Sequence, residues 1–335
     1  MSSNLVIFFF LVLNILLLMN FSKIKFFYLN IDKPDKVRKF HSKPTPLAGG
    51  QIIFLNILIY LIFLNFFQDL IDDEIIFKNL KSFNIFMLIS SIIFLIGFID
   101  DRLNLKANLK FFLLFFAIFF LLLIDKSLII STIKFSFYNE SLSLNKFGIF
   151  FSIFCFLVFL NAFNMFDGIN LQSSSYTIFI FICLLIFFSN SLFIKILILT
   201  LLSFSYLNYK NRTFLGDSGS LLIAFIISYF FIKLYNLNYI QYTDDVVLYM
   251  IIPGLDLIRL FMLRIFNKKN PLNSDRLHLQ HLLVSRYNLN KTLLIIITLF
   301  VFPILLNYIE IQNIITIILT ILVYSILLIY LNQKN

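Results

Sequence analysis

The sequence predicts an all-α integral membrane protein with about 11 transmembrane helices. Of the 335 residues, 60% are hydrophobic and only 13% are charged, which leaves too little polar surface to cover a soluble globule of this size. Long apolar runs separated by short polar loops make up most of the chain. We therefore expect one polytopic membrane domain over residues 1–335, because no long soluble segment interrupts these runs.

Each expected span is a run of about 20 mostly apolar residues, the length that crosses a bilayer. In chain order the candidate spans cover residues 4–22, 48–68, 83–99, 108–124, 147–163, 174–189, 192–207, 218–236, 246–265, 292–308 and 313–332. The spans 174–189 and 192–207 have almost no connector, which predicts a tight helical hairpin. Between the fourth and fifth spans, STIKFSFYNESLSL alternates in polarity, which predicts a small β-hairpin.

The charge distribution predicts that the N-terminus lies outside and the C-terminus in the cytoplasm. No basic residue precedes the first span, whereas Lys23 and Lys25 follow it, so this span is expected to be retained. With this orientation, most of the 27 Lys and Arg fall in cytoplasmic loops or at the C-terminus. The net charge of +10 is spread over these loops, so it reports topology and does not indicate nucleic-acid binding.

Five polar segments all fall on the predicted cytoplasmic side, at residues 32–51, 97–110, 161–170, 211–220 and 270–281. In the second, Asp100 and Asp101 follow an apolar run, and each charge would cost about 2.5–3.5 kcal/mol at the centre of a bilayer. A metal or phosphate site at the membrane surface is the leading hypothesis. For this pair alone, a helix end in water is an equal alternative.

The third and fourth segments carry residue types that bind hard cations and phosphate. Asn161 and Asn164 share one helix face, and Asp167 begins the turn that follows; amide and carboxylate oxygens suit Mg²⁺. Asp217 opens the eighth span, where free N–H groups and the helix dipole suit a phosphate and the carboxylate could hold a cation. A helix C-terminus and an N-cap without ligand are the respective alternatives.

The first and last segments are basic. Gly49 and Gly50 could let the backbone approach a ligand closely, although a simple positive-inside loop is the more common structure. His278 and His281 follow Arg276, and they favour phosphate or nucleotide contact over zinc, since no third soft ligand is nearby. A solvated basic loop is an equal alternative for these three residues.

Taken together, the five ordered segments resemble the polyprenyl-phosphate N-acetylhexosamine-1-phosphate transferase family over residues 32–281. The stretches RKFHSKPTPLAGG, IPGLDLIRLFMLR and SDRLHLQH are similar to the WecA-like branch of these glycosyltransferases. The resemblance implies that a sugar 1-phosphate is transferred from a UDP-N-acetylhexosamine to a membrane polyprenyl phosphate such as undecaprenyl phosphate, with release of UMP. It also implies a multi-pass protein of the bacterial inner membrane with its active site facing the cytoplasm.

The resemblance further implies roles for single residues. Asp100 and Asp101 would position the acceptor, assist a metal or remove a proton. Asp167 is a further candidate catalytic residue and, with Asn161, would support the nucleotide pocket. Asn164 and Asp217 would hold Mg²⁺, or Mn²⁺ in its place. Substrate contacts would come from Lys110, Asn161, Arg264, Arg276, His278 and His281. The protein could also form a homodimer.

Two positions depart from the family pattern: Gln280 replaces the middle histidine of the last motif, and Leu114 replaces an expected Gln. The competing hypothesis is a membrane transporter that uses buried carboxylates. A transporter should place ionisable groups near the bilayer midplane, whereas here the sequence gathers them on one side.

Overall fold

The computed structural model describes residues 2–34, 43–67, 76–77, 80–187, 191–268 and 277–333. The chain divides into two compact units. Unit 1 comprises residues Met1–Lys126 and Ser173–Ile227, and unit 2 comprises Ser127–Gln172 and Ser228–Asn335. Each unit is therefore built from two separate stretches of chain, and α8 (Gly216–Asn236) contributes its first part to unit 1 and its last part to unit 2.

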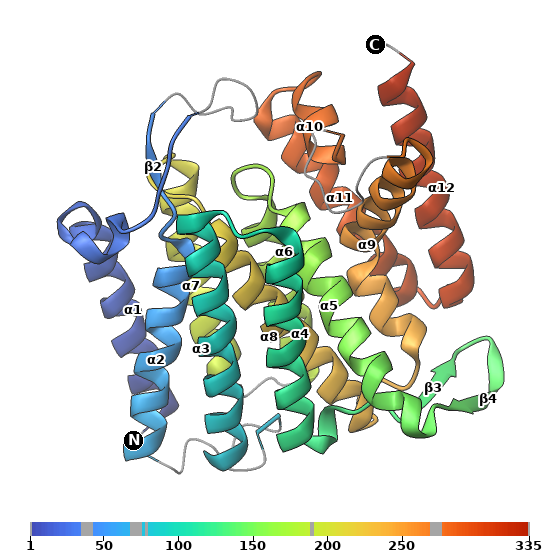
Figure 1. The fold of residues 1–335 in the computed structure, drawn as a ribbon, viewed down its shortest axis with the longest axis horizontal. Helices are drawn as coiled ribbons and strands as arrows, with labels where there is room; N and C mark the ends of the chain where they lie inside the picture. The colour runs from blue at the N-terminus through green and yellow to red at the C-terminus, as the bar shows by residue number, and fades with distance from the viewer. Residues whose placement is uncertain are drawn as a thin grey trace. The chain divides into compact units, whose positions relative to one another are not determined.

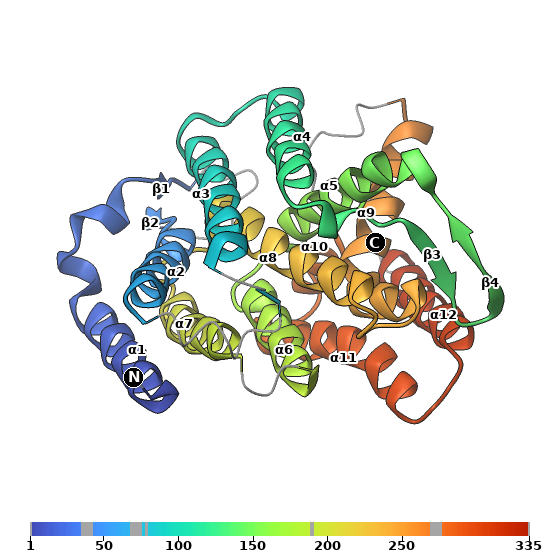
Figure 2. The ribbon, with the colours of Figure 1, turned by 90° about the horizontal axis from the view of Figure 1, so that it is seen from below.

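Unit 1 is a bundle of helices (Figure 1). Its helices are α1 (Ser3–Asn20), α2 (Gly49–Phe66), α3 (Leu80–Leu103), α4 (Ala107–Ile124), α6 (Gln172–Phe187), α7 (Leu192–Tyr209) and the start of α8. The link from α1 to α2 holds the short 3-10 helices η1 (Phe21–Lys23) and η2 (Lys25–Tyr28) and the two-residue strands β1 (Ile31–Asp32) and β2 (Thr45–Pro46). Helix α2 packs between α7 and α3, and α4 packs on α3 (Figure 2).

Unit 2 contains α5 (Gly148–Phe166), α9 (Thr243–Phe266), α10 (Leu279–Val284), α11 (Leu289–Tyr308) and α12 (Asn313–Asn332). Helix α9 packs on α5, α11 and α12. The strands β3 (Thr132–Phe135) and β4 (Tyr138–Ser143) lie between η4 (Lys126–Leu128) and η5 (Asn145–Phe147). The six-residue α10 was not expected from the sequence, because six residues carry too little periodicity to reveal a helix.

Each apolar run predicted to cross the membrane coincides over most of its length with one of these helices. A helix satisfies its own backbone hydrogen bonds, which is the condition for crossing hydrocarbon. In the part of the chain that the structure describes, ten helices are long and apolar enough to span a bilayer. Helix α6 is shorter, with 16 residues. The chain is thus a multi-pass α-helical membrane protein, while the count of about 11 spans and their sidedness stay predictions.

The hairpin predicted between the fourth and fifth spans is confirmed. Strands β3 and β4 pair antiparallel, with Thr132 opposite Ser143. The hydroxyl of Tyr235 in α8 donates to the carbonyl of Thr132 (2.9 Å) and accepts from the N–H of Lys134 (3.0 Å). Asp244 at the start of α9 accepts from the N–H and hydroxyl of Ser136. The hairpin is therefore anchored to the ends of two helices of unit 2.

Candidate active site

The first polar cluster is in unit 1, where Asp100, Lys110 and Asp217 meet. Asp100 lies in the last turn of α3, Lys110 in the first turn of α4 and Asp217 in the first turn of α8. The Lys110 Nζ lies 2.7 Å from Asp100 Oδ2 and 2.8 Å from Asp217 Oδ2. One ammonium therefore contacts two carboxylates that come from different helices.

The two carboxylates differ in their surroundings. The side chain of Asp100 is 8% exposed, and its second oxygen accepts from the N–H of Leu105 at 2.7 Å, which fixes the turn from α3 to α4. The side chain of Asp217 is 37% exposed. Since Asp100 is held on both oxygens, Asp217 is the carboxylate of this cluster that a ligand can reach.

Asp101 lies next to Asp100 but has a different partner, the first turn of α8. Its carboxylate accepts from the N–H of Asp217 at 2.7 Å, and from the N–H and hydroxyl of Ser218 at 3.1 and 2.7 Å. These are two of the unpaired N–H groups that every helix start presents. The prediction that a phosphate binds the N–H groups of this turn is wrong for these two, because Asp101 already occupies them.

Two glycines allow close contacts at the start of α8: Gly216 lies against Asp101 of α3, and Gly50 of α2 lies against Gly219. Gly216 has φ of +75°, and a Cβ there would lie 2.8 Å from Asp101 Oδ2. A Cβ on Gly50 would lie 2.4 Å from the N of Gly219. The N–H of Gly49 donates to Phe214 O and that of Gly50 to Leu215 O. The backbone that approaches this glycine pair is therefore the segment before α8, whereas the sequence had suggested a ligand.

The acidic cluster fits a hard cation by its chemistry. Carboxylate oxygens of Asp100 and Asp217 already converge on one positive group, the Lys110 ammonium. Within the described ranges, no three His, Cys, Asp or Glu side chains are placed to hold a metal by themselves. Mg²⁺ needs no such cage, because it usually takes one or two carboxylates and completes its shell with water and substrate phosphate.

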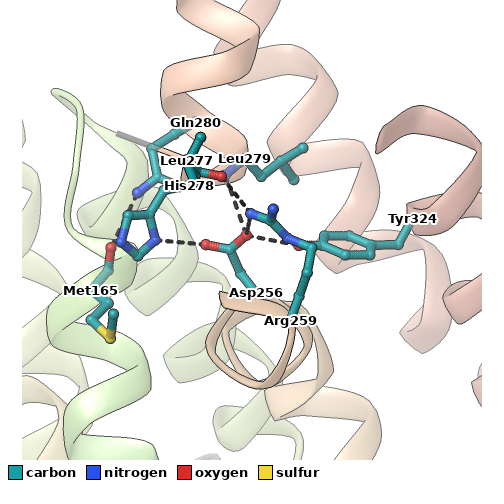
Figure 3. Close-up of polar contacts among 8 residues, drawn as sticks. All are labelled: Met165, Asp256, Arg259, Leu277, His278, Leu279, Gln280 and Tyr324. Atoms are coloured by element: carbon teal, nitrogen blue, oxygen red, sulfur yellow. Dashed lines mark hydrogen bonds and ion pairs between the residues drawn. The ribbon is translucent and has the colours of Figure 1, made fainter. Parts of the chain in front are cut away.

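The second polar cluster is in unit 2, around Asp256 of α9 (Figure 3). Asp256 is 4% exposed and His278, just before α10, is 5% exposed. Asp256 Oδ2 lies 2.8 Å from His278 Nδ1, and Oδ1 accepts from the N–H of Leu279 at 3.2 Å. One carboxylate therefore holds both the ring of His278 and the start of α10.

Two further side chains hold Asp256 from the other side. Arg259 donates to Asp256 Oδ1 at 2.7 Å and to the carbonyl of Leu277 at 2.6 Å. The hydroxyl of Tyr324, from α12, donates to the same Asp256 oxygen at 2.7 Å and accepts from Arg259 Nε at 3.2 Å. Figure 3 shows Asp256 between the histidine on one side and this Arg–Tyr pair on the other.

Gln280, the residue that departs from the family pattern, joins α10 to the end of α5. Its Nε2 donates to the carbonyl of Met165 at 3.1 Å. A Cβ on Gly168 would lie 2.5 Å from that same nitrogen. The amide of Gln280 thus packs directly against Gly168, where a larger residue would leave no room for it.

The remaining predicted site residues of unit 2 lie on α5, α9 and α10. Asn161 and Asn164 share α5, which ends at Phe166, so Asp167 and Gly168 form the expected turn. The amide of Asn161 donates to the carbonyl of Leu157 in its own helix at 2.7 Å. Arg264 is buried in the last turn of α9, and the ring of His281 lies 6.1 Å from that of His278.

Some predictions fall outside the described residues or span both units. Arg276 and the basic residues of 35–42 lie outside the described residues. Asp217 belongs to unit 1 and Asn164 to unit 2, so their pairing at a metal stays a prediction.

Sequence reasoning missed three roles. Tyr324 was not singled out, Asp256 and Arg259 were quoted without a function, and Asp101 was not expected to cap α8. The available signal was an Asp within the apolar run of α9, which needs a compensating partner.

The fold and the two clusters define a multi-pass membrane protein with carboxylates and a lysine at the ends of α3, α4 and α8, and with a buried Asp256–His278 pair between α9 and the start of α10. The family model described as Glycosyl transferase family 4 matches residues 83–235. The undecaprenyl-phosphate alpha-N-acetylglucosaminyl 1-phosphate transferase of Escherichia coli (strain K12) is 25% identical over 281 residues, covering 80% of this chain and 73% of that protein. The protein of the same name from Thermotoga maritima is 27% identical over 274 residues, covering 80% of this chain and 77% of that protein.

The chain is therefore similar to glycosyl transferase family 4 over its central part, and to these transferases over most of its length. The resemblance drawn from the five polar segments is therefore confirmed. The matched region includes Asp100, Asp101, Lys110 and Asp217, and it ends before the Asp256–His278 cluster.

Proposed function

We propose that this protein transfers an N-acetylhexosamine 1-phosphate from a UDP-sugar to a polyprenyl phosphate, the initiating step of a cell-envelope glycan such as O-antigen. An oxygen of the lipid phosphate attacks the phosphorus next to the sugar. The bond between that phosphorus and the oxygen of UMP breaks, and UMP leaves. The product is a lipid-linked sugar diphosphate. The relatives carry undecaprenyl phosphate and N-acetylglucosamine in their names, which makes these the first acceptor and donor to test.

The observation that carries the proposal is the contact of Lys110 with both Asp100 and Asp217. Both substrates are anionic, so charge repulsion is part of the barrier and a transferase must gather cations where the phosphates meet. The cluster meets this need with a fixed ammonium and with an exposed carboxylate, Asp217, that can recruit a cation. Lys110 can bind a substrate phosphate by exchanging one of its two carboxylate contacts.

We further propose that Mg²⁺, or Mn²⁺ in its place, binds Asp217 with Asn164 as a second ligand. When bound, the metal supplies positive charge to the diphosphate. Asp100 and Asp101 then have separate tasks. Asp100 orients Lys110, and Asp101 holds the first turn of α8 and so orients Asp217.

In unit 2, His278, His281, Arg264 and Arg276 would bind the nucleotide sugar, and Asn161 and Asp167 would support the nucleotide. We place these groups on the cytoplasmic face of the bacterial inner membrane. The helix ends that bear the acidic cluster belong to loops rich in Lys and Arg, which supports that orientation.

The test is UMP release by purified protein in detergent, given undecaprenyl phosphate, Mg²⁺ and UDP-N-acetylglucosamine. We expect release that needs both lipid and metal, stops with EDTA and is lost in Asp217→Ala. A panel of other UDP-N-acetylhexosamines defines the donor. Folded protein that releases no UMP with any of these donors would contradict the proposal.

A further inference from the structure

Asp256 accepts four hydrogen bonds that are unequally divided between its two oxygens. Oδ1 receives Arg259, the hydroxyl of Tyr324 and the N–H of Leu279. Among the described residues, Oδ2 has one hydrogen-bond partner, His278 Nδ1. An ionised carboxylate only accepts hydrogen bonds, so the contact with Oδ2 requires a proton on His278 Nδ1.

This contact decides which atom of His278 can serve a substrate. With Nδ1 committed to Asp256, contact through a ring nitrogen is left to Nε2. The ring cannot turn over without breaking the 2.8 Å contact in a site where His278 is 5% exposed. Asp256 therefore sets both the orientation of the imidazole and the position of its proton.

The support of Asp256 comes from two different helices. Arg259 is one turn along α9 and balances the buried negative charge. Tyr324 comes from α12, 68 residues along the chain, and its hydroxyl bonds to both Asp256 and Arg259. A carboxylate held by three donors on one oxygen keeps the other oxygen fixed toward the histidine.

We propose that Asp256 is a positioning residue for His278 and that Tyr324 supports it, so that Nε2 of His278 contacts an anionic group of the nucleotide sugar. This inference rests on the proposed function. It gives α12 a task in substrate recognition, although none of its residues belongs to the polar motifs of the family.

The decisive variant is Asp256→Asn, which keeps the shape of the side chain. Three donors surround the position of Oδ1, so the Asn oxygen should stay there and its amide should face His278. Nδ1 must then accept a hydrogen bond, and the proton moves to Nε2. The variant thus reverses the donor and acceptor atoms of the imidazole without removing it.

Nitrogen NMR of protein with ¹⁵N-labelled histidine reads this change directly and needs no substrate. The chain has only three histidines, so loss of one signal in His278→Gln assigns the resonance. We expect a protonated Nδ1 in the wild type and the Nε2–H tautomer in Asp256→Asn. Asp245→Asn is the matched control, because Asp245 is another acidic residue of α9, bonded to Asn313 (2.6 Å), and should leave the His278 signals unchanged.

Kinetics then connect the tautomer to function. We expect Asp256→Asn to lower kcat/KM for UMP release about 10- to 100-fold, the range found when a carboxylate that orients a metal-binding histidine is lost. Tyr324→Phe should lower it about 3- to 10-fold, since it removes one of three donors. Adding Asp256→Asn to His278→Ala should cause no further loss, because both changes act through one ring.

The NMR and kinetic measurements distinguish failure of the positioning role from failure of the proposed function. An active wild type whose His278 keeps its tautomer in Asp256→Asn overturns the positioning role, as does a double variant in which the two losses multiply. A tautomer that changes as expected in protein without any transferase activity overturns the proposed function instead.

Discussion

The carboxylate of Asp101 accepts hydrogen bonds from both the N–H and the hydroxyl of Ser218, in the first turn of α8. The same carboxylate accepts a hydrogen bond from the N–H of Asp217, so Asp101 positions the more exposed Asp217. Asp100 and Asp101 are adjacent in sequence and point to different partners. We therefore expect substitutions of the two residues to have different consequences.

Asp101→Ala should destabilise the protein and reduce activity together. It leaves the N–H groups of Asp217 and Ser218 without an acceptor, and each orphaned buried donor costs about 1–3 kcal/mol. Thermal unfolding in detergent, run beside the UMP assay, measures both effects. Ser218→Ala removes only the hydroxyl contact and should cost about 1 kcal/mol. An Asp101→Ala protein as stable as the wild type would show that the cap contributes nothing.

Lys110→Met should abolish UMP release while the protein stays folded. Removal of the ammonium leaves Asp100 and Asp217 facing each other, which costs about 1–3 kcal/mol because Asp217 is partly screened by solvent. The repulsion would also displace Asp217, and displacement of a catalytic group by about 1 Å can lower a rate about 100-fold. Lys110→Arg keeps the charge and should retain more activity than Lys110→Met. Equal rates for the two variants would rule out the charge as the cause.

Gly168→Ala should lower stability by about 1 kcal/mol, because the new Cβ displaces the Gln280 amide from the carbonyl of Met165. In a Gln280→Ala background the same change should cost almost nothing, since the obstacle is gone. Unfolding midpoints of the four proteins test this coupling. Strict additivity of the two single changes would indicate that the residues do not act on each other.

Tyr235→Phe should loosen the β3–β4 hairpin and leave the transfer reaction unchanged. The hydroxyl is the acceptor for Lys134 N–H and the donor to Thr132, so its loss should cost about 1–3 kcal/mol. Faster amide hydrogen exchange at Lys134, with an unaltered rate of UMP release, is the expected result. Unchanged exchange at this amide would mean that the anchor is dispensable.

Much of the fold follows from local patterns in the sequence. Apolar runs of bilayer length became helices, and the alternation around Thr132 and Ser143 became a hairpin, because in each case neighbours along the chain decide the structure. Helix ends were also predictable, which is why Asp100, Asp167 and Asp217 lie in or just beyond end turns as expected.

The pairing of these residues could not be predicted in the same way. Lys110 meets Asp217 across 107 residues, and Tyr324 meets Asp256 across 68. Such contacts depend on how separate helices pack, so no local periodicity in the sequence predicts them. A tyrosine in an apolar span has the same sequence signature whether it faces lipid or a buried carboxylate, so no sequence pattern singles out Tyr324.

The hydroxyl of Tyr324 makes the last helix a functional part rather than a dispensable tail. A premature stop codon after α11, or a shortened expression clone, would strip Asp256 of one donor while leaving every family motif intact. A chimaera that borrows its final helices from another membrane protein would lose the same donor, and we expect at least the about 3- to 10-fold lower kcat/KM of Tyr324→Phe unless the borrowed helix offers a hydroxyl at that level. Restoring one tyrosine in such a chimaera is then the minimal repair.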